Sequence, residues 1–222
     1  MRGISCAAMV DLFFLDDSSF IPMSLTLVNL RFLDWEAISL SMELGEAICI
    51  RGESGSGKSL LLRAIADLIP HEGEVTLKGE LRSSVSASDW RRRVGYLPAE
   101  ILWWEDSVLD HFLEAPSGER LGALGLSSEC MEWHPHRLSM GERQRLGLLR
   151  LLDRDPEVLL LDEPTANLDD ETARRVETMI LDYAKEANAE LIWVTHSESQ
   201  AERVGLKRYR MKDKQFRLEE RG

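Results

Sequence analysis

Residues 52–59 read Gly-Glu-Ser-Gly-Ser-Gly-Lys-Ser, the complete G-x-x-x-x-G-K-S pattern of a phosphate-binding loop. Glycines at this spacing let the backbone curl until successive N–H groups point inward at phosphate oxygens. Lys58 can reach the β- and γ-phosphates, and the Ser59 hydroxyl can ligate Mg²⁺. The residues predicted to bind a nucleoside triphosphate are Gly52, Glu53, Ser54, Gly55, Ser56, Gly57, Lys58, Ser59 and Leu60.

The segments on either side of this loop have the character that phosphate binding requires. Residues 46–51 form a short, mostly apolar run that predicts a buried strand. Residues 59–66 predict a helix, whose positive N-terminal end would face the anion. Strand, loop and helix in this order favour a real phosphate site over a chance match.

A second element supplies carboxylates for the same chemistry. Residues 159–164 read Leu-Leu-Leu-Asp-Glu-Pro, an apolar strand that ends in two acids. At the carboxyl end of a parallel sheet, such a strand would deliver Asp162 to Mg²⁺. Glu163 could then orient or deprotonate the water that attacks the γ-phosphate.

Strand-like and helical patterns alternate along most of the chain, which predicts an α/β fold with a largely parallel sheet covered on both faces. The expected strands lie within 25–45 and 74–82 and at 94–98, 156–162 and 190–195, with a hairpin at 208–219; the expected helices lie at 140–152 and 171–187. Residues 1–22 fit poorly, and we expect an N-terminal extension that is disordered or reflects an upstream start codon.

Composition narrows the class of partner. The 222-residue chain has a net charge of −12, which argues against a general nucleic-acid binder. Its three cysteines are few and unpatterned, which suits a reducing cytosol. No run approaches the roughly 18 apolar residues needed to cross a bilayer. We therefore expect a cytoplasmic location.

Residues 138–145 read Leu-Ser-Met-Gly-Glu-Arg-Gln-Arg and resemble the signature sequence of the ATP-binding cassette (ABC) ATPases. Other family landmarks follow in order, with Ala166–Asp169 in the place of the D-loop and His196 in the place of the switch histidine. The resemblance covers about residues 23–215. It implies a phosphate-loop ABC ATPase core over 23–222, with an antiparallel β subdomain and a small helical subdomain at about 101–152.

The resemblance also implies a role for each site residue. Two copies of the domain would pack head-to-tail with ATP between them, so that the signature residues Ser139, Gly141 and Glu142 meet the nucleotide of the other copy. Lys58, Glu163 and His196 would be catalytic, and Asp169 would communicate across the dimer. An aromatic residue before the phosphate loop would stack on adenine. Trp35 is the first candidate for it and Phe32 the second.

Several positions depart from the family pattern. Leu60 stands where Thr is usual, and Met140 and Glu142 replace a glycine and a glutamine of the signature. Ala99 falls at the expected Q-loop glutamine, and Glu100, one residue later, is a candidate substitute ligand for Mg²⁺. Because the central residues are all present, we expect slow but real Mg²⁺-dependent ATP hydrolysis.

Three functions remain open at this level. The first is the ATPase subunit of an ABC transporter that drives a separate membrane permease from the cytoplasmic face. The second is a soluble ABC ATPase that acts as an ATP-gated regulatory clamp, and the third is a small phosphate-loop kinase. Trp103 and Trp104 suit either a permease-docking groove or a core. His134 and His136 favour a loop over a metal site.

Overall fold

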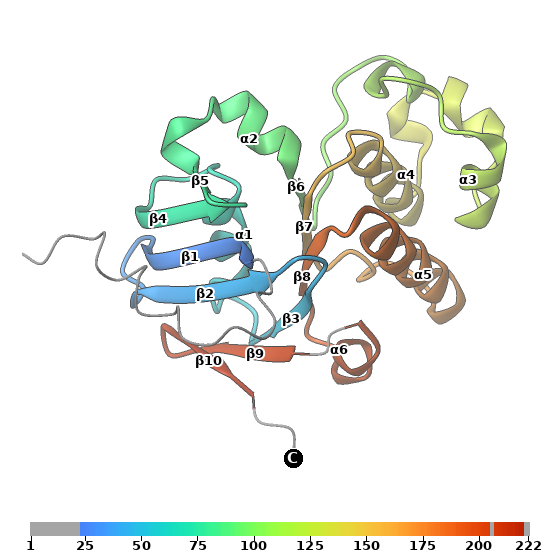
Figure 1. Ribbon diagram of the computed structural model, residues 1–222. Helices are drawn as coiled ribbons and strands as arrows, with labels where there is room; N and C mark the ends of the chain where they lie inside the picture. Colours follow the sequence, from blue (N-terminus) through green and yellow to red (C-terminus); the bar gives the residue numbers. More distant parts are fainter. Residues whose placement is uncertain (1–22, 205–206, 220–222) are drawn as a thin grey trace, which may run out of the picture.

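The structure, a computed structural model, describes residues 23–204 and 207–219 (Figure 1). The predicted extension at 1–22 lies outside the described residues. The strands are β1 (Met23–Arg31), β2 (Ile38–Glu43), β3 (Ala47–Arg51), β4 (Glu72–Leu77), β5 (Glu80–Leu81), β6 (Val94–Leu97), β7 (Val158–Asp162), β8 (Glu190–Val194), β9 (Lys207–Lys212) and β10 (Gln215–Leu218). The helices are α1 (Lys58–Ile65), α2 (Ala87–Arg93), α3 (Gly118–Ala123), α4 (Met140–Leu152), α5 (Asp170–Ala187) and α6 (Glu198–Val204).

The main sheet has the order β10-β9-β3-β8-β7-β6. Neighbouring strands from β9 to β6 are parallel, and β10 is antiparallel to β9. Because β3, β8 and β7 are adjacent and parallel, their carboxyl ends lie at one edge, where ligands bind in open α/β sheets. The sheet order therefore brings the loops after these three strands together.

A separate antiparallel sheet, β2-β1-β4-β5, stands beside the main sheet (Figure 1). Its strand β2 alternates buried and exposed residues, as expected of a sheet with one solvated face. The second sheet and the parallel main sheet confirm the predicted fold class.

Two apolar clusters cover opposite faces of the main sheet. Along β7, Val158 and Leu160 point into a cluster shared with α1 and the antiparallel sheet. Leu159 and Leu161 point into the other cluster, which includes residues of α4, α5 and α6. The strict alternation follows from the period of two in a strand, and it explains why β7 is apolar throughout.

Most of the expected elements are present within one or two residues of their predicted bounds. The strand and helix that flank the phosphate loop, the helix at 140–152 and the C-terminal hairpin are examples. Two helices were not predicted, α2 and α6. Residues 101–137 contain one short α-helix, α3, and several 3-10 turns, including Ser128–Glu132.

Among the helices of the described residues, none combines the length and the apolar character that crossing a bilayer requires.

Candidate nucleotide site

The phosphate loop connects β3 to α1, as the sequence predicts. Gly57 is the N-cap of α1 and has φ 82°, in the left-handed region that glycine tolerates best. A Cβ added at Gly57 would lie 2.7 Å from the Trp35 ring, so this ring rests directly on the loop. Phe32 is buried in the core at 1% exposure and stacks behind Trp35. Of the two aromatic candidates, Trp35 is therefore the one beside the loop.

The Lys58 ammonium organises the loop from inside. Its Nζ donates to the carbonyl oxygens of Gly52 at 2.9 Å and Glu53 at 2.8 Å. The side chain is buried. Ser59, the next residue, is exposed at the start of α1, and Leu60 packs against the core. The loop thus combines a buried cation, an exposed hydroxyl and the N-terminus of a helix, which suits an anion.

The ends of the three central strands are joined by backbone hydrogen bonds. Glu163 N donates to the Val194 carbonyl at 3.1 Å, and Thr195 N donates to the Ile50 carbonyl at 3.2 Å. These bonds continue the ladder one residue past each strand. They hold the acidic residues after β7 and the histidine after β8 in a fixed relation to the phosphate loop after β3.

Glu163 and His196 contact each other at this edge. His196 Nδ1 lies 3.2 Å from Glu163 Oε2. Glu163 has φ 48°, a left-handed conformation that is unusual for a residue with a side chain. Its carbonyl accepts a hydrogen bond from Gln144 Nε2 of α4 at 3.4 Å. Strained backbone that is held by several bonds is typical of functional sites.

The proposed magnesium ligands fit the way this ion binds. Mg²⁺ is usually held by one or two carboxylates together with substrate phosphates and water. Asp162 is buried at 4% exposure, and α1, which carries Ser59, packs against β7. The described residues contain no cluster of three His, Cys, Asp or Glu that would form a metal site without phosphates. Ser59 and Asp162 therefore suit a nucleotide-bound Mg²⁺.

The strand before the altered Q-loop supplies a residue that sequence reasoning missed. The Tyr96 hydroxyl donates to Asp162 Oδ2 at 3.2 Å. Burial and the Asp162 charge raise the pKa of Tyr96, which keeps this hydroxyl a donor. Ala99 and Glu100 are exposed. Within the described part of the chain, Glu100 makes no side-chain hydrogen bond or ion pair, so its role as a metal ligand stays a prediction.

The signature residues form the start of α4. Ser139 is the N-cap in a capping box, in which its backbone N and hydroxyl donate to Glu142 Oε2 at 2.8 and 2.7 Å. A Cβ added at Gly141 would lie 3.0 Å from Leu168, so this turn packs against the D-loop segment. In the described part of the chain, no hydrogen bond or ion pair links Ser139, Gly141 or Glu142 to the phosphate loop of the same copy.

Asp169 begins α5, and its side chain is engaged within its own chain. Its Oδ1 accepts from the backbone N of Glu171 at 3.1 Å and of Thr172 at 3.0 Å. These bonds to Thr172 and Glu171 lower the pKa of Asp169. The structure therefore shows a helix cap at this position, and the cross-dimer role stays a prediction.

A buried polar network connects the segments after Glu163 and His196. Gln200 Nε2 on α6 donates to Thr165 Oγ1 at 2.6 Å and to Glu177 Oε1 at 2.8 Å, and its Oε1 accepts from Trp193. Arg203 pairs with Glu177 through two hydrogen bonds. Because α6 was not expected, the sequence offered no signal for this network.

Comparison with known proteins identifies the family. The family model described as ABC transporter matches residues 35–166, more than half of the chain. The phosphate import ATP-binding protein PstB of Aeropyrum pernix is 36% identical over 199 residues, 76% of this chain and 77% of that protein. The Escherichia coli protein named "Probable iron export ATP-binding protein FetA" is 33% identical over 193 residues, 79% of this chain and 86% of that protein.

A solved structure shows the same fold. It is the dimeric post-hydrolysis state of the ATP-binding cassette MJ0796 bound to ADP and Pi, with a TM-score of 0.74 at 24% identity. The match covers 89% of this chain and 99% of that one. With the site geometry above, the family model and these relatives show that the chain belongs to the ABC transporter family, as an ATP-binding domain.

Proposed function

We propose that this protein is the ATP-hydrolysing subunit of an ABC transporter, which pairs with a second copy and drives a separate membrane permease. Its relatives are named for import and for export, so the proposal covers the energising step and leaves direction unassigned. ATP would bind with Mg²⁺, and the domain would lie against the cytoplasmic face of the membrane through the permease.

The observation that carries the proposal is the Glu163–His196 contact at the edge where the phosphate loop also lies. Glu163 would hold the attacking water, and His196 would fix the water and the γ-phosphate in line. Lys58 and the N-terminus of α1 would stabilise the charge that develops on the phosphate oxygens. A binding protein without catalysis would need the loop but not this pair.

Completion of the site by a second copy is supported by the position of the signature. Gly141 lies against Leu168 of its own D-loop segment, and neither Ser139 nor Gly141 makes a described bond to the phosphate loop of the same copy. In a two-fold dimer, the same surface of each copy would meet the phosphate loop of the other. Asp169 would then lie near the symmetry axis and relate the two sites.

A surface near the altered Q-loop suits the permease. Leu102 is 71% exposed and Trp104 is 66% exposed, although both are large apolar side chains. Arg150 lies over the rings of Trp103 and Trp104 and donates to the Leu102 carbonyl, which holds this loop rigid. Exposed aromatic residues on a rigid support are typical of binding hot spots.

The alternative is a soluble ABC ATPase that acts as an ATP-gated clamp without a permease. The specific observation in its favour is Ala99 at the position through which the family senses the permease. Retention of this protein by a membrane permease on co-purification, with loss on Trp104→Ala, would favour the transporter.

The test of catalysis compares Mg²⁺-dependent phosphate release by the wild type and Glu163→Gln. We expect kcat to fall about 100- to 1,000-fold with ATP binding retained, because the base is removed but the loop is intact. Glu132→Gln, an exposed change away from the site, should match the wild type. Equal rates for Glu163→Gln and wild type would rule the assignment out, and transfer of phosphate to an acceptor would indicate a kinase.

A further inference from the structure

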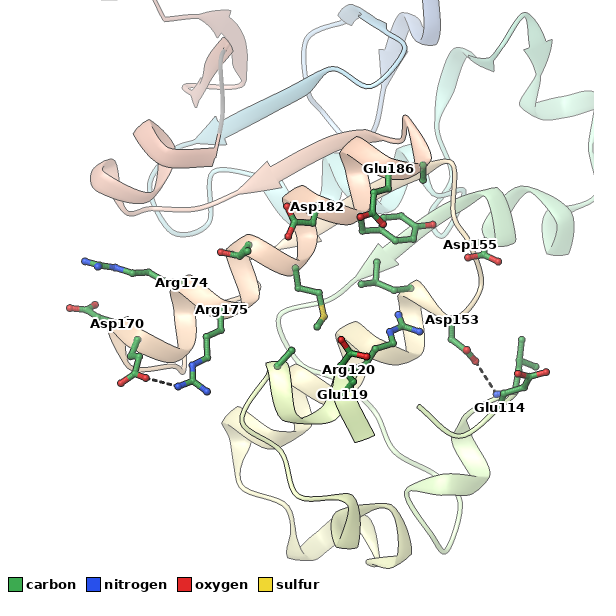
Figure 2. A pocket seen from close by; sticks show the side chains of 18 residues that line it. Glu114, Glu119, Arg120, Asp153, Asp155, Asp170, Arg174, Arg175, Asp182 and Glu186 are labelled. Carbon is green, nitrogen blue, oxygen red and sulfur yellow. Dashed lines mark hydrogen bonds and ion pairs between the residues drawn. The ribbon is translucent and has the colours of Figure 1, made fainter. Parts of the chain in front are cut away.

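A large open groove lies between α3 and α5, away from the phosphate loop. Its volume is about 1540 Å³, and the end of α4 closes one side (Figure 2). None of residues 52–60 lines it. Figure 2 shows the labelled side chains reaching it from α5 on one side and from α3 and the end of α4 on the other. We call it the α3–α5 groove.

The floor of the α3–α5 groove is apolar and fixed. Leu152 is buried at 2% exposure, and Met179 and Tyr183 are half-buried against the same core cluster. The Tyr183 hydroxyl donates to the Pro156 carbonyl at 3.0 Å, which holds the ring in place. At the rim, Leu113 is 74% exposed. The groove therefore offers a firm apolar strip that an apolar face of a ligand could cover.

The rim of the α3–α5 groove is strongly acidic. Eight carboxylates and three arginines line it, and in the described part of the chain only Glu171 among these carboxylates has an ion pair, with Arg175. On α5 the lining residues recur on one stripe, from Asp170 through Asp182 to Ala187. The 18 residues of α5 extend about 27 Å, so the stripe spans several helical turns. Its carboxylates lie toward the two ends, with Arg174 and Arg175 between them.

We infer that the α3–α5 groove binds a basic, amphipathic helical segment of a partner protein. The apolar face of such a helix would cover Leu113, Met179 and Tyr183, and its Lys or Arg side chains would meet Asp182 and Glu186 of α5. In helix-in-groove recognition an amphipathic helix lays its apolar face into an apolar groove, and the rim carboxylates add charge complementarity to a basic helix. The length of the stripe suits a helix better than a small cation. This inference goes beyond the proposed function and does not depend on it.

Charge disfavours the other occupants. Nucleic acid and anionic lipid would be repelled by the rim carboxylates. A second copy of this chain carries a net charge of −12. The segment 1–22 of the chain itself contains three aspartates and one arginine, so it also has the wrong sign. A basic partner is the complementary one, and its association should be steered by charge and weakened by salt.

The probe is an amphipathic helical peptide of leucine and lysine, equal in length to α5, titrated calorimetrically into the full chain. Asp182→Lys/Glu186→Lys reverses two exposed charges near the C-terminal end of α5, where lysine suits the helix. Glu129→Lys/Glu132→Lys is the matched control, with the same change in net charge on exposed residues outside the groove. ATPase activity, expected to equal that of wild type, reports that both variants are folded.

We expect the groove variant to bind the peptide at least tenfold more weakly than wild type, and the control variant to bind within about twofold. Affinity should fall between about 0.05 and 0.5 M salt, and a peptide with glutamate in place of lysine should not bind. Equal binding by the groove variant, or equal binding of the acidic peptide, would overturn the inference. So would tighter binding of a peptide of residues 1–22, or self-association of the chain that the groove variant abolishes.

Discussion

The carboxylate of Glu142 occupies the donors that the proposed dimer would turn toward ATP. Both the hydroxyl and the backbone N of Ser139 donate to its Oε2. Burial alone would raise the pKa of Glu142, but the Ser139 bonds and the Arg145 charge outweigh it, so the pKa is lowered. Glu142 is thus an anion at the helix N-terminus, and in the proposed dimer a γ-phosphate would have to displace it.

Glu142→Gln should therefore let ATP compete more easily with the side chain of residue 142 for the Ser139 donors. The amide can keep one bond to Ser139 but carries no charge, so we expect half-maximal ATPase activity at severalfold lower ATP. Stability should fall by about 0.5 kcal/mol, because an anion at a helix N-terminus is lost. Urea unfolding and steady-state kinetics measure the two effects, with Glu129→Gln as the surface control. An unchanged or higher ATP requirement would contradict the displacement.

Strand β8 begins with a carboxylate in an unfavourable place. Glu190 is 0% exposed, and among the described residues neither of its carboxylate oxygens has a hydrogen-bond partner. Burial raises the pKa of Glu190, and the opposing effect of the neighbouring Ser24 hydroxyl is smaller. The charged form of Glu190 thus destabilises the amino end of β8, which lies at the edge of the sheet away from the nucleotide site.

Glu190→Gln should stabilise the fold at alkaline pH and not at acid pH. The folded pKa lies above the unfolded value of about 4.3, so wild-type stability falls as pH rises from the unfolded through the folded pKa. We expect a gain of about 1–2 kcal/mol for the variant at about pH 8, which shrinks at about pH 5. Urea unfolding at both pH values measures it, with Glu132→Gln as control. An equal gain in unfolding free energy at both pH values would show that ionisation of Glu190 is not what destabilises the wild type.

The elements differ in how far they can be predicted from sequence. Long apolar runs such as β7 and amphipathic α5 are visible, because burial imposes a period on many residues. The helices α2 and α6 are seven residues long and bury few side chains, among them Trp90 and Ala201, so they leave little periodic signal. The short elements of 101–137 begin at local caps such as Ser117 and Ser127, but each is too short to show a hydrophobic period.

The residues of the site also differ in how far they can be predicted from sequence. Motif spacing predicted Lys58, Asp162 and Glu163, and the family resemblance predicted His196; all four lie at or just beyond strand ends of one sheet. The Tyr96–Asp162 bond joins β6 to the end of β7, and the left-handed Glu163 donates its backbone N to the Val194 carbonyl at the end of β8. Both are contacts between segments that lie far apart in the chain, and a single sequence gives no local sign of such contacts.

Each molecule carries the phosphate loop of one proposed composite site and the signature of the other. Its net negative charge opposes the pairing of two copies. Because each copy has a net charge of −12, two copies repel each other at low ionic strength. We therefore expect association to need ATP at the interface and salt in solution. Glu163→Gln should hold ATP without hydrolysis and accumulate as a dimer. The dimer fraction should rise between about 0.02 and 0.2 M salt, because the Debye length shortens.

Sedimentation velocity with Mg²⁺ and ATP measures this dimer. Lys58→Ala/Glu163→Gln is the control, since it removes the cation of the phosphate loop, whose Nζ donates to the Gly52 carbonyl, and it should stay monomeric. Consistent with pairing, the wild-type ATPase rate per molecule should rise with protein concentration. If Glu163→Gln stays monomeric at saturating ATP, and the rate per molecule is independent of concentration, each chain completes its own site and the signature of α4 has another role.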